Sequence, residues 1–270
     1  MAIHKSEGII LSTANWSESS QTITLFTPDR GRLVLNVREA RRLTGKRGRP
    51  MTFARLEFSY YLREGGESGY LSDVEPVEVF LFEKDGQLGR LTFASASLEL
   101  LNNLLIVSDP QPACYQITLS FLRMADSIDK NRLPGLFAGY IFRVISLLGF
   151  RPNLAGCAGC GGEIAVDTAE PEAGLYFSIE RGGLVCDDCR RAMPGQDHLI
   201  GLSEMLRSKM LNLMESSLEE AARIPVTLSE LNAMMNLVTS LLKYHSGTIR
   251  PLKSFDFLEK LTRAVKAYGG

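Results

Sequence analysis

The chain has 270 residues and a formal net charge of −1, with 45% hydrophobic and 23% charged residues. These fractions are ordinary for a globular protein, and they exclude a disordered chain, a collagen-like repeat and a small disulfide scaffold. The apolar stretch near the N-terminus spans about four residues, too few for a signal peptide, and no window approaches the ~20 apolar residues of a membrane span. We therefore expect a cytoplasmic protein that does not enter a membrane.

Residues 1–75 show the alternating pattern of short β-strands. Residues 21–27 and 31–37 flank a turn with Pro and Gly in suitable places, and they form a predicted hairpin. Three further strands are predicted near residues 9–15, at 52–62 and from 70 onward. Five short strands in so short a stretch favour a small closed barrel over a parallel sheet.

After Pro76 the apolar residues follow helical spacing. The predicted helices cover residues 88–107, 113–129, 136–148, 203–222 and 229–247, with a last one around 257–265. Residues 153–198 interrupt this pattern with four clustered cysteines and eight glycines. The predicted fold class is therefore α+β: a five-stranded barrel domain at 1–80, then an all-helical domain at 81–270 that carries a four-cysteine insert at 153–198.

Two C-x-x-C pairs in the insert predict a metal site. The pairs are Cys157 with Cys160 and Cys186 with Cys189, and 25 residues separate them. A two-residue gap lets both thiolates of a pair face one ion, and two pairs complete the tetrahedral four-sulfur shell that zinc accepts. Such a shell has no open position, so the predicted Zn²⁺ is structural, one per chain. Redox activity of one pair is the alternative, and Cys114 is expected to be a core residue.

The most basic part of the chain is residues 30–63, which hold ten cations and two acids. Nine of the ten are arginine, whose planar guanidinium group matches phosphate oxygens. Like charges repel, so this concentration favours a polyanionic partner, and a basic groove on a small barrel is one way to bind single strands. The predicted contacts with nucleic-acid phosphates are Arg30, Arg32, Arg38, Arg41, Arg42, Lys46, Arg47 and Arg49.

Other interpretations stay open. The alternatives for the basic stretch at residues 30–63 are a solvated loop, the RNA-binding part of a barrel and zinc-ribbon protein, or a docking loop of a protein-interaction scaffold. A nucleic-acid enzyme would need a composite site, because the chain lacks P-loop, G-x-G-x-x-G, G-x-S-x-G and H-E-x-x-H motifs, and we expect no enzyme. Trp16, Tyr60 and Tyr61 are candidates for base stacking or for the barrel core. His245 is expected to end a helix.

Several motifs, in order along the chain, resemble those of the bacterial RecO family of DNA repair proteins. They are Glu7-Gly-Ile-Ile-Leu-Ser-Thr13, Thr22-Ile-Thr-Leu-Phe-Thr27 with Gly31, Arg38-Glu-Ala-Arg41-Arg42, the cysteine insert with Tyr176-Phe-Ser178 and Gly182-Gly183, and the closing Leu242-Lys-Tyr-His-Ser-Gly247 and Leu252-Lys-Ser-Phe-Asp-Phe-Leu258. Glu39 stands where the family has a glycine.

The resemblance implies a recombination mediator with an N-terminal OB-fold, a helical domain and a zinc finger. Such proteins bind single- and double-stranded DNA and anneal complementary strands. With RecR, and in some systems RecF, they help load RecA onto strands covered by single-strand-binding protein (SSB). Members also dock the acidic, apolar C-terminal tail of SSB.

Overall fold

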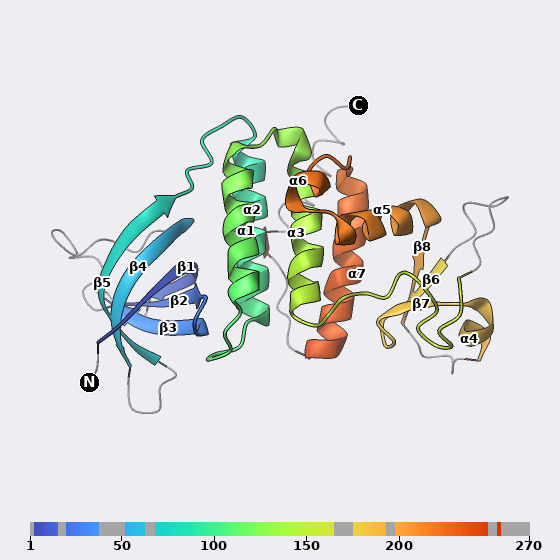
Figure 1. The fold of residues 1–270 in the computed structure, drawn as a ribbon, viewed down its shortest axis with the longest axis horizontal. Coiled ribbons are helices and arrows are strands. Elements are labelled where there is room, and N and C mark those ends of the chain that lie inside the picture. The colour runs from blue at the N-terminus through green and yellow to red at the C-terminus, as the bar shows by residue number, and fades with distance from the viewer. Residues whose placement is uncertain are drawn as a thin grey trace. The chain divides into compact units, whose positions relative to one another are not determined.

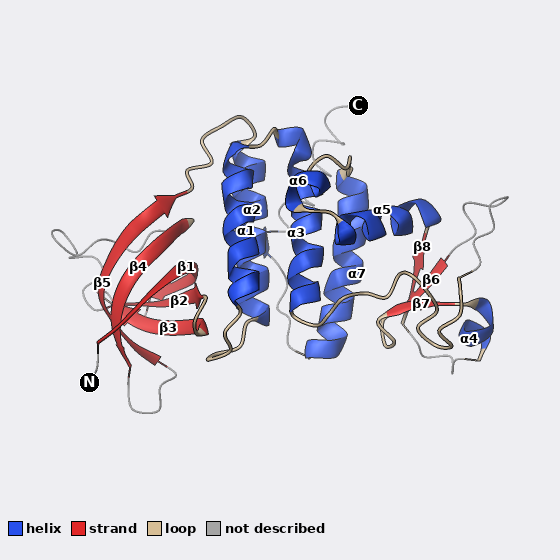
Figure 2. Ribbon diagram, viewed as in Figure 1, coloured by secondary structure: helices blue, strands red, loops and turns tan. Residues whose placement is uncertain are grey.

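The computed structural model describes residues 3–15, 20–37, 52–62, 68–164, 175–192, 198–247 and 253–254. The chain divides into two compact units, residues 1–130 with 250–270, and residues 131–249. The first unit contains strands β1–β5 with helices α1 and α2, and the second contains helices α3–α7 with a small sheet, β6–β8 (Figure 1, Figure 2). Among the described residues, no helix combines the length and hydropathy needed to cross a membrane.

The first unit is built on a closed barrel with strand order β1-β2-β3-β5-β4. The strands are β1 (Ile3–Asn15), β2 (Gln21–Thr27), β3 (Gly31–Val37), β4 (Ala54–Leu62) and β5 (Ser68–Val79). All neighbours are antiparallel except β3 and β5, which pair in parallel over three residues. This confirms the predicted five-stranded barrel, which is OB-like.

Strand β1 closes the barrel because it pairs with β2 along one part of its length and with β4 along the other. The register between β1 and β2 shifts between Ile10 and Ser12, and such a bulge bends a strand and increases its twist. The sequence pattern predicted a shorter first strand, because residues 3–8 lie on the curved end where the burial is less regular.

Alternate residues of each strand point into the barrel, as the burial of Leu33, Leu35 and Val37 on β3 shows. Each buried aliphatic or aromatic side chain contributes about 1.5–3 kcal/mol relative to an exposed one. The interior cluster consists of Ile10, Ile23, Leu25, Leu33, Leu35, Val37, Ala54, Leu56, Phe58, Tyr60 and Val74. Tyr60 is 1% exposed, so of its two predicted roles the structure places it in the barrel core.

Helices α1 (Gln87–Leu104) and α2 (Pro112–Ser127) pack on the outer side of the barrel. Phe26 points outward from β2 and meets Tyr115 of α2 edge to face, with ring centroids 5.4 Å apart. Both side chains are fully buried. The barrel wall therefore has two apolar sides along β2, one facing the interior and one facing the helices.

The connection between α1 and α2 is fastened to the β2–β3 turn. The backbone N–H of Arg32 donates to the carbonyl of Ile106 at 3.3 Å. Gly31 has a φ of 62°, and a Cβ there would lie 2.0 Å from the carbonyl oxygen of Asp109. Only glycine fits this position, because the backbone is left-handed and the neighbouring chain occupies the space of a side chain.

Outside the cysteine insert, the described part of the second unit contains four helices. The helices are α3 (Leu133–Leu147), α5 (Glu204–Glu215), α6 (Leu218–Ala221) and α7 (Leu228–Ser246), preceded by a 3-10 turn at Lys130–Arg132. The single helix predicted over 203–222 is two helices, because Ser216 is extended and Ser217 caps a new helix in a capping box with Glu220. A second capping box, Thr227 with Glu230, begins α7.

The cysteine insert forms a three-stranded antiparallel sheet in the order β7-β6-β8. Its elements are β6 (Leu175–Ser178), β7 (Gly183–Val185), the short helix α4 (Asp187–Arg191) and β8 (Leu199–Leu202). The sheet thus runs a few residues beyond the predicted end of the insert at 198. The helix predicted around 257–265 lies outside the described residues.

Candidate metal centre and nucleic-acid interface

The four cysteines of the insert converge on one point. Their sulfur atoms all lie within 4.8 Å of one another, although Cys157 and Cys160 come from a turn before the sheet, and Cys186 and Cys189 from the start of α4. None is in a disulfide, and the Sγ atoms of Cys160 and Cys186 are 3.9 Å apart. A tetrahedral shell with Zn–S bonds of 2.3 Å needs about 3.8 Å between sulfurs. The donor set therefore fits a four-coordinate metal ion.

Backbone hydrogen bonds shape the first knuckle. Cys157 N–H donates to the carbonyl of Gly162 at 2.8 Å, and the N–H of Gly161 donates back to the carbonyl of Cys157 at 2.9 Å. Gly161 has a φ of 75°, a conformation that side chains disfavour. The N–H of Ala158 donates to Leu184 of β7 at 2.7 Å, which fixes the knuckle against the sheet. The glycine-rich sequence thus serves the tight turn.

The four sulfurs differ in their surroundings. Cys157 is 2% exposed, and its Sγ accepts hydrogen bonds from the N–H groups of Gly159 and Cys186, each at 3.3 Å. Burial raises the pKa of the Cys157 thiol, but the backbone N–H groups of Cys186, Cys160 and Gly159 outweigh it and bring the pKa to about 6. The pKa of Cys189 is raised to about 12 by hydrogen bonds with the other three sulfurs, and the bond with Cys186 has the largest effect. A metal ion bound by these thiols would displace their protons, because thiolates are the ligands.

Two of the predicted DNA contacts lie in the described part of the chain: Arg30 in the β2–β3 turn and Arg32 at the start of β3. Thr27 fixes this turn, because its hydroxyl accepts from the N–H of Arg30 and donates to the carbonyl of Gly31, both at 3.2 Å. Burial raises the pKa of Tyr60, and the guanidinium of Arg30 beside it opposes that rise. Arg32 is half-buried, and its Nε has no hydrogen-bond partner among the described residues.

The other predicted contacts are not placed. Arg38, Arg41, Arg42, Lys46, Arg47 and Arg49 lie outside the described residues, as does Trp16. The strands that flank their segment are described: β3 ends at Val37 and β4 begins at Ala54, both in the barrel. Residues 38–53, called the basic segment from here on, therefore connect two strands of the barrel.

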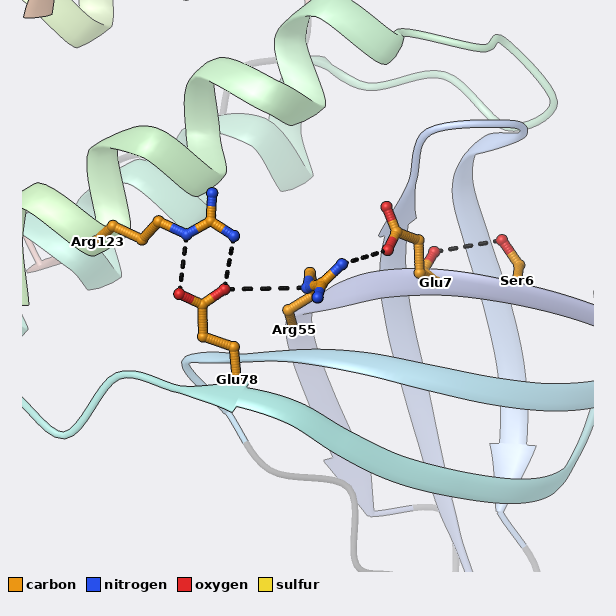
Figure 3. A network of polar contacts seen from close by, with 5 residues as sticks. All are labelled: Ser6, Glu7, Arg55, Glu78 and Arg123. Atoms are coloured by element: carbon orange, nitrogen blue, oxygen red, sulfur yellow. Dashed lines mark hydrogen bonds and ion pairs between the residues drawn. The ribbon is translucent and has the colours of Figure 1, made fainter.

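Arg55 is a cation of the basic stretch that the structure shows to be neutralised. Its Nη1 lies 2.8 Å from a carboxylate oxygen of Glu7, and its Nε lies 3.9 Å from Glu78, which also binds Arg123 (Figure 3). The sequence did not reveal this pairing, because Glu7 and Glu78 are distant along the chain and become neighbours only through strand register. Tyr61, on the opposite side of β4 from Tyr60, is half-buried.

Comparisons with known proteins cover both units. A family model described as "Recombination protein O N terminal" matches residues 1–80, and one described as "Recombination protein O C terminal" matches residues 86–255. The DNA repair protein RecO of Symbiobacterium thermophilum is 30% identical over 267 residues, which cover 98% of this chain and 100% of that protein. The DNA repair protein RecO of Pelotomaculum thermopropionicum is 29% identical over 272 residues, with 100% and 98% covered.

Proposed function

The chain belongs to the RecO family and acts in DNA repair as a recombination mediator, and on that premise we propose that it binds single- and double-stranded DNA through its barrel and anneals complementary strands. The residues proposed to contact DNA are Arg30, Arg32, Arg38, Arg41, Arg42, Lys46, Arg47 and Arg49. The observation that carries this proposal is the attachment of the basic segment to the barrel between β3 and β4.

The chemistry of annealing needs a cationic surface and no bond cleavage. Two strands repel each other through their phosphates, and arginines that neutralise phosphates reduce that repulsion and release condensed counterions. The planar guanidinium group also stacks on bases, which leaves base edges accessible for pairing. The backbone of Arg30, in the β2–β3 turn, and of Arg32, at the start of β3, is held in place by Thr27 and by the α1–α2 connection.

We propose that the protein acts with RecR, and where present with RecF, to help load RecA onto strands covered by SSB. The family membership supports this role, and the proposed DNA binding is a requirement for it, since loading takes place on DNA strands. The C-terminal tail of SSB is the proposed docking partner on those strands.

We also propose that Cys157, Cys160, Cys186 and Cys189 hold one Zn²⁺ per chain. Zinc supplies a cross-link between the knuckle at Cys157 and the start of α4, and it leaves no open coordination position for catalysis. The sheet it would fasten has strands of only three and four residues, too short to be stable without further support. The proposed metal therefore stabilises this part of the second unit.

Strand annealing across a salt series tests the DNA-binding proposal. Fluorescent complementary strands, bare or covered by SSB, are mixed with wild-type protein, with the triple variant Arg41→Glu, Arg42→Glu, Arg47→Glu, and with a control triple variant. The control reverses three exposed cations of the second unit, Arg132→Glu, Arg223→Glu and Lys243→Glu, and so changes the net charge equally. We expect the first variant alone to lose annealing.

Wild-type rates in the first variant, or equal losses in both, would overturn the proposal. For about four to eight phosphate contacts, wild-type affinity should fall by orders of magnitude between low and moderate salt. Stronger competition by RNA than by DNA would instead favour an RNA-binding protein. Atomic absorption of wild-type protein, Cys157→Ser and Cys186→Ser tests the metal, with one zinc per chain expected only in the wild type.

A further inference from the structure

One cation lies beside the cysteine cluster without a carboxylate partner in the part of the chain that the structure describes. It is Arg181, an exposed residue in the turn between β6 and β7. A Cβ placed on Gly159 would lie 3.1 Å from Nη1 of Arg181 and 2.9 Å from Sγ of Cys189. The guanidinium nitrogen and the sulfur are thus at most about 6 Å apart, close enough for the charges of a guanidinium group and a thiolate to attract each other. Glycine at 159 leaves the space that both groups occupy.

The turn that carries Arg181 is fixed to the metal module by its backbone. The N–H of Arg181 donates to the hydroxyl of Ser178 at 3.3 Å, and Ser178 is fully buried. Asn153 N–H donates to the carbonyl of Gly182 at 2.9 Å. Gly183 has no room for a side chain, since a Cβ there would lie 2.8 Å from Asn153. The position of Arg181 is therefore set by the fold, although its side chain is exposed.

Helix α7 holds the same turn from another side. The ring Nε2 of His245 lies 2.9 Å from the carbonyl of Ile179, to which it can donate. A Cβ on Gly182, whose φ is 64°, would lie 3.7 Å from a methyl carbon of Leu241. The end of α7 thus contacts the turn on which Arg181 stands, so the guanidinium is presented to the cysteines by a supported loop.

The position of Arg181 beside the cysteines matters because the metal-bound cluster would carry a negative charge. Four thiolates around Zn²⁺ carry a formal charge of −2, and the two aspartates of the second knuckle would add to it. Those aspartates are already paired: Asp187 with Arg190 at 3.0 Å and Asp188 with Arg191 at 3.2 Å. Arg181 is then the described cation left to offset the thiolates themselves.

We propose that Arg181 is a positioning residue of the metal site, whose guanidinium offsets the negative charge of the four thiolates and slows loss of the metal. The inference rests on the proposed Zn²⁺ site. Groups outside the coordination shell typically change metal affinity by 10- to 100-fold, and an exposed cation belongs at the lower end of that range. Salt should weaken the effect, because exposed charges are screened.

The test is the rate at which a chromophoric chelator takes Zn²⁺ from the full-length protein. We expect Arg181→Gln to lose zinc about tenfold faster than wild type, and Arg181→Lys to stay near wild type because it keeps the charge. Arg223→Gln, an exposed substitution outside the metal module, is the matched control and should not differ from wild type. Raising the KCl concentration should speed zinc loss from wild type toward the rate of Arg181→Gln, which itself should change little.

Several outcomes would overturn the inference. If Arg181→Gln retains zinc as wild type does, or if Arg181→Lys loses it as fast as Arg181→Gln, the charge of this residue does not hold the metal. Circular dichroism of the zinc-loaded variants should match that of wild type, and a variant that unfolds while loaded would assign Arg181 a folding role instead. Wild-type protein that never takes up Zn²⁺ would overturn the proposed metal site together with this inference.

Discussion

Arg123 of α2 makes two hydrogen bonds to the carboxylate of Glu78 of β5: Nε donates to one oxygen at 2.8 Å, and Nη2 donates to the other at 2.7 Å (Figure 3). Arg55 lies between Glu78 and Glu7, so alternating charges connect β1, β4, β5 and α2. Ser6, next along β1, donates its hydroxyl to the carbonyl of Glu7 at 3.2 Å. The network ties the barrel to the helix that covers it.

The acid sensitivity of this network can be predicted. The hydrogen bonds from Arg123 hold the pKa of Glu78 below its ordinary value of 4.5, although burial opposes them. A depressed carboxyl pKa contributes stability above the unfolded value, and this is lost as the pH falls through the folded value. Glu78→Gln should therefore lower the free energy of unfolding near pH 7, by at most about 1 kcal/mol for a partly exposed pair.

Urea unfolding of both proteins at about pH 7 and about pH 3 measures this difference. The gap between Glu78→Gln and wild type should narrow at the lower pH, because the contribution of the ionised carboxyl is lost as the pH falls toward the folded pKa of Glu78. Glu83→Gln, at an exposed position, should show no gap at either pH. A penalty of equal size at both values would contradict the assignment to charge.

Arg90 of α1 is expected to be a large contributor to the stability of the first unit. It is 2% exposed, and its guanidinium donates to the carbonyls of Asp85, Ala125 and Ile128 at 3.0, 2.5 and 2.5 Å. Arg90→Leu should cost about 3 kcal/mol or more, because it leaves buried carbonyls without donors. Arg90→Lys should be nearly as harmful, since one ammonium group lacks the planar fork that reaches all three.

Chemical unfolding, followed by tryptophan fluorescence or circular dichroism, checks the Arg90 prediction. Arg132→Leu removes an exposed arginine of the same size and should change the free energy of unfolding by less than about 0.5 kcal/mol. If Arg90→Leu and Arg132→Leu had the same free energy of unfolding, the three hydrogen bonds of Arg90 would not contribute to stability.

Alanine substitutions at Gly31 and Gly89 compare a position that requires glycine with one that does not. Gly31→Ala should destabilise the first unit by more than about 1 kcal/mol, because φ is 62° and the new Cβ would lie 2.0 Å from the carbonyl of Asp109. Gly89→Ala places a Cβ in open space within α1 and should stabilise the protein by about 0.5–1 kcal/mol. Thermal unfolding distinguishes them, and a shift of the same sign in both would show that the α1–α2 connection does not hold the turn.

The structure separates two classes of arginine in the basic stretch. The double variant Arg30→Gln, Arg32→Gln should flatten the slope of log affinity against log salt by about 2 for DNA, since each lost phosphate contact removes about 0.9. Arg55→Gln should leave that slope unchanged and lower stability instead, because two carboxylates already neutralise its guanidinium. Fluorescence anisotropy across a KCl series measures both slopes, and equal flattening would place Arg55 on the DNA-binding surface.

Local patterns predicted those features of the fold that depend on local chemistry. The alternation of apolar residues gave the barrel strands, and the spacing of Cys157, Cys160, Cys186 and Cys189 gave a cluster that the structure brings within 4.8 Å. Features that depend on distant contacts were missed. The neutralisation of Arg55 needs the register of β1 against β4, and the position of Arg181 needs the packing of Gly159 against the turn after β6.

Helix ends were predicted less well than helix interiors. Apolar spacing runs through residues 203–222 without a break, whereas the backbone turns at Ser216. The carbonyl of Ser216 accepts hydrogen bonds from the guanidinium of Arg143, whose Nε donates at 2.9 Å. This tertiary contact lies where α5 ends, and the Ser217 and Glu220 capping box that begins α6 was also missed by the helix prediction.

Glu7, Arg55 and Glu78 of the barrel and Arg123 of α2 are all partly exposed, so dissolved salt affects this protein in two ways. It weakens the proposed association with DNA, and it also weakens the attraction among these four side chains, whose exposed fractions lie between 26% and 47%. A binding curve recorded at high ionic strength therefore mixes two responses. Parallel calorimetry at each ionic strength would separate the loss of a bound strand from the loosening of the scaffold that receives it.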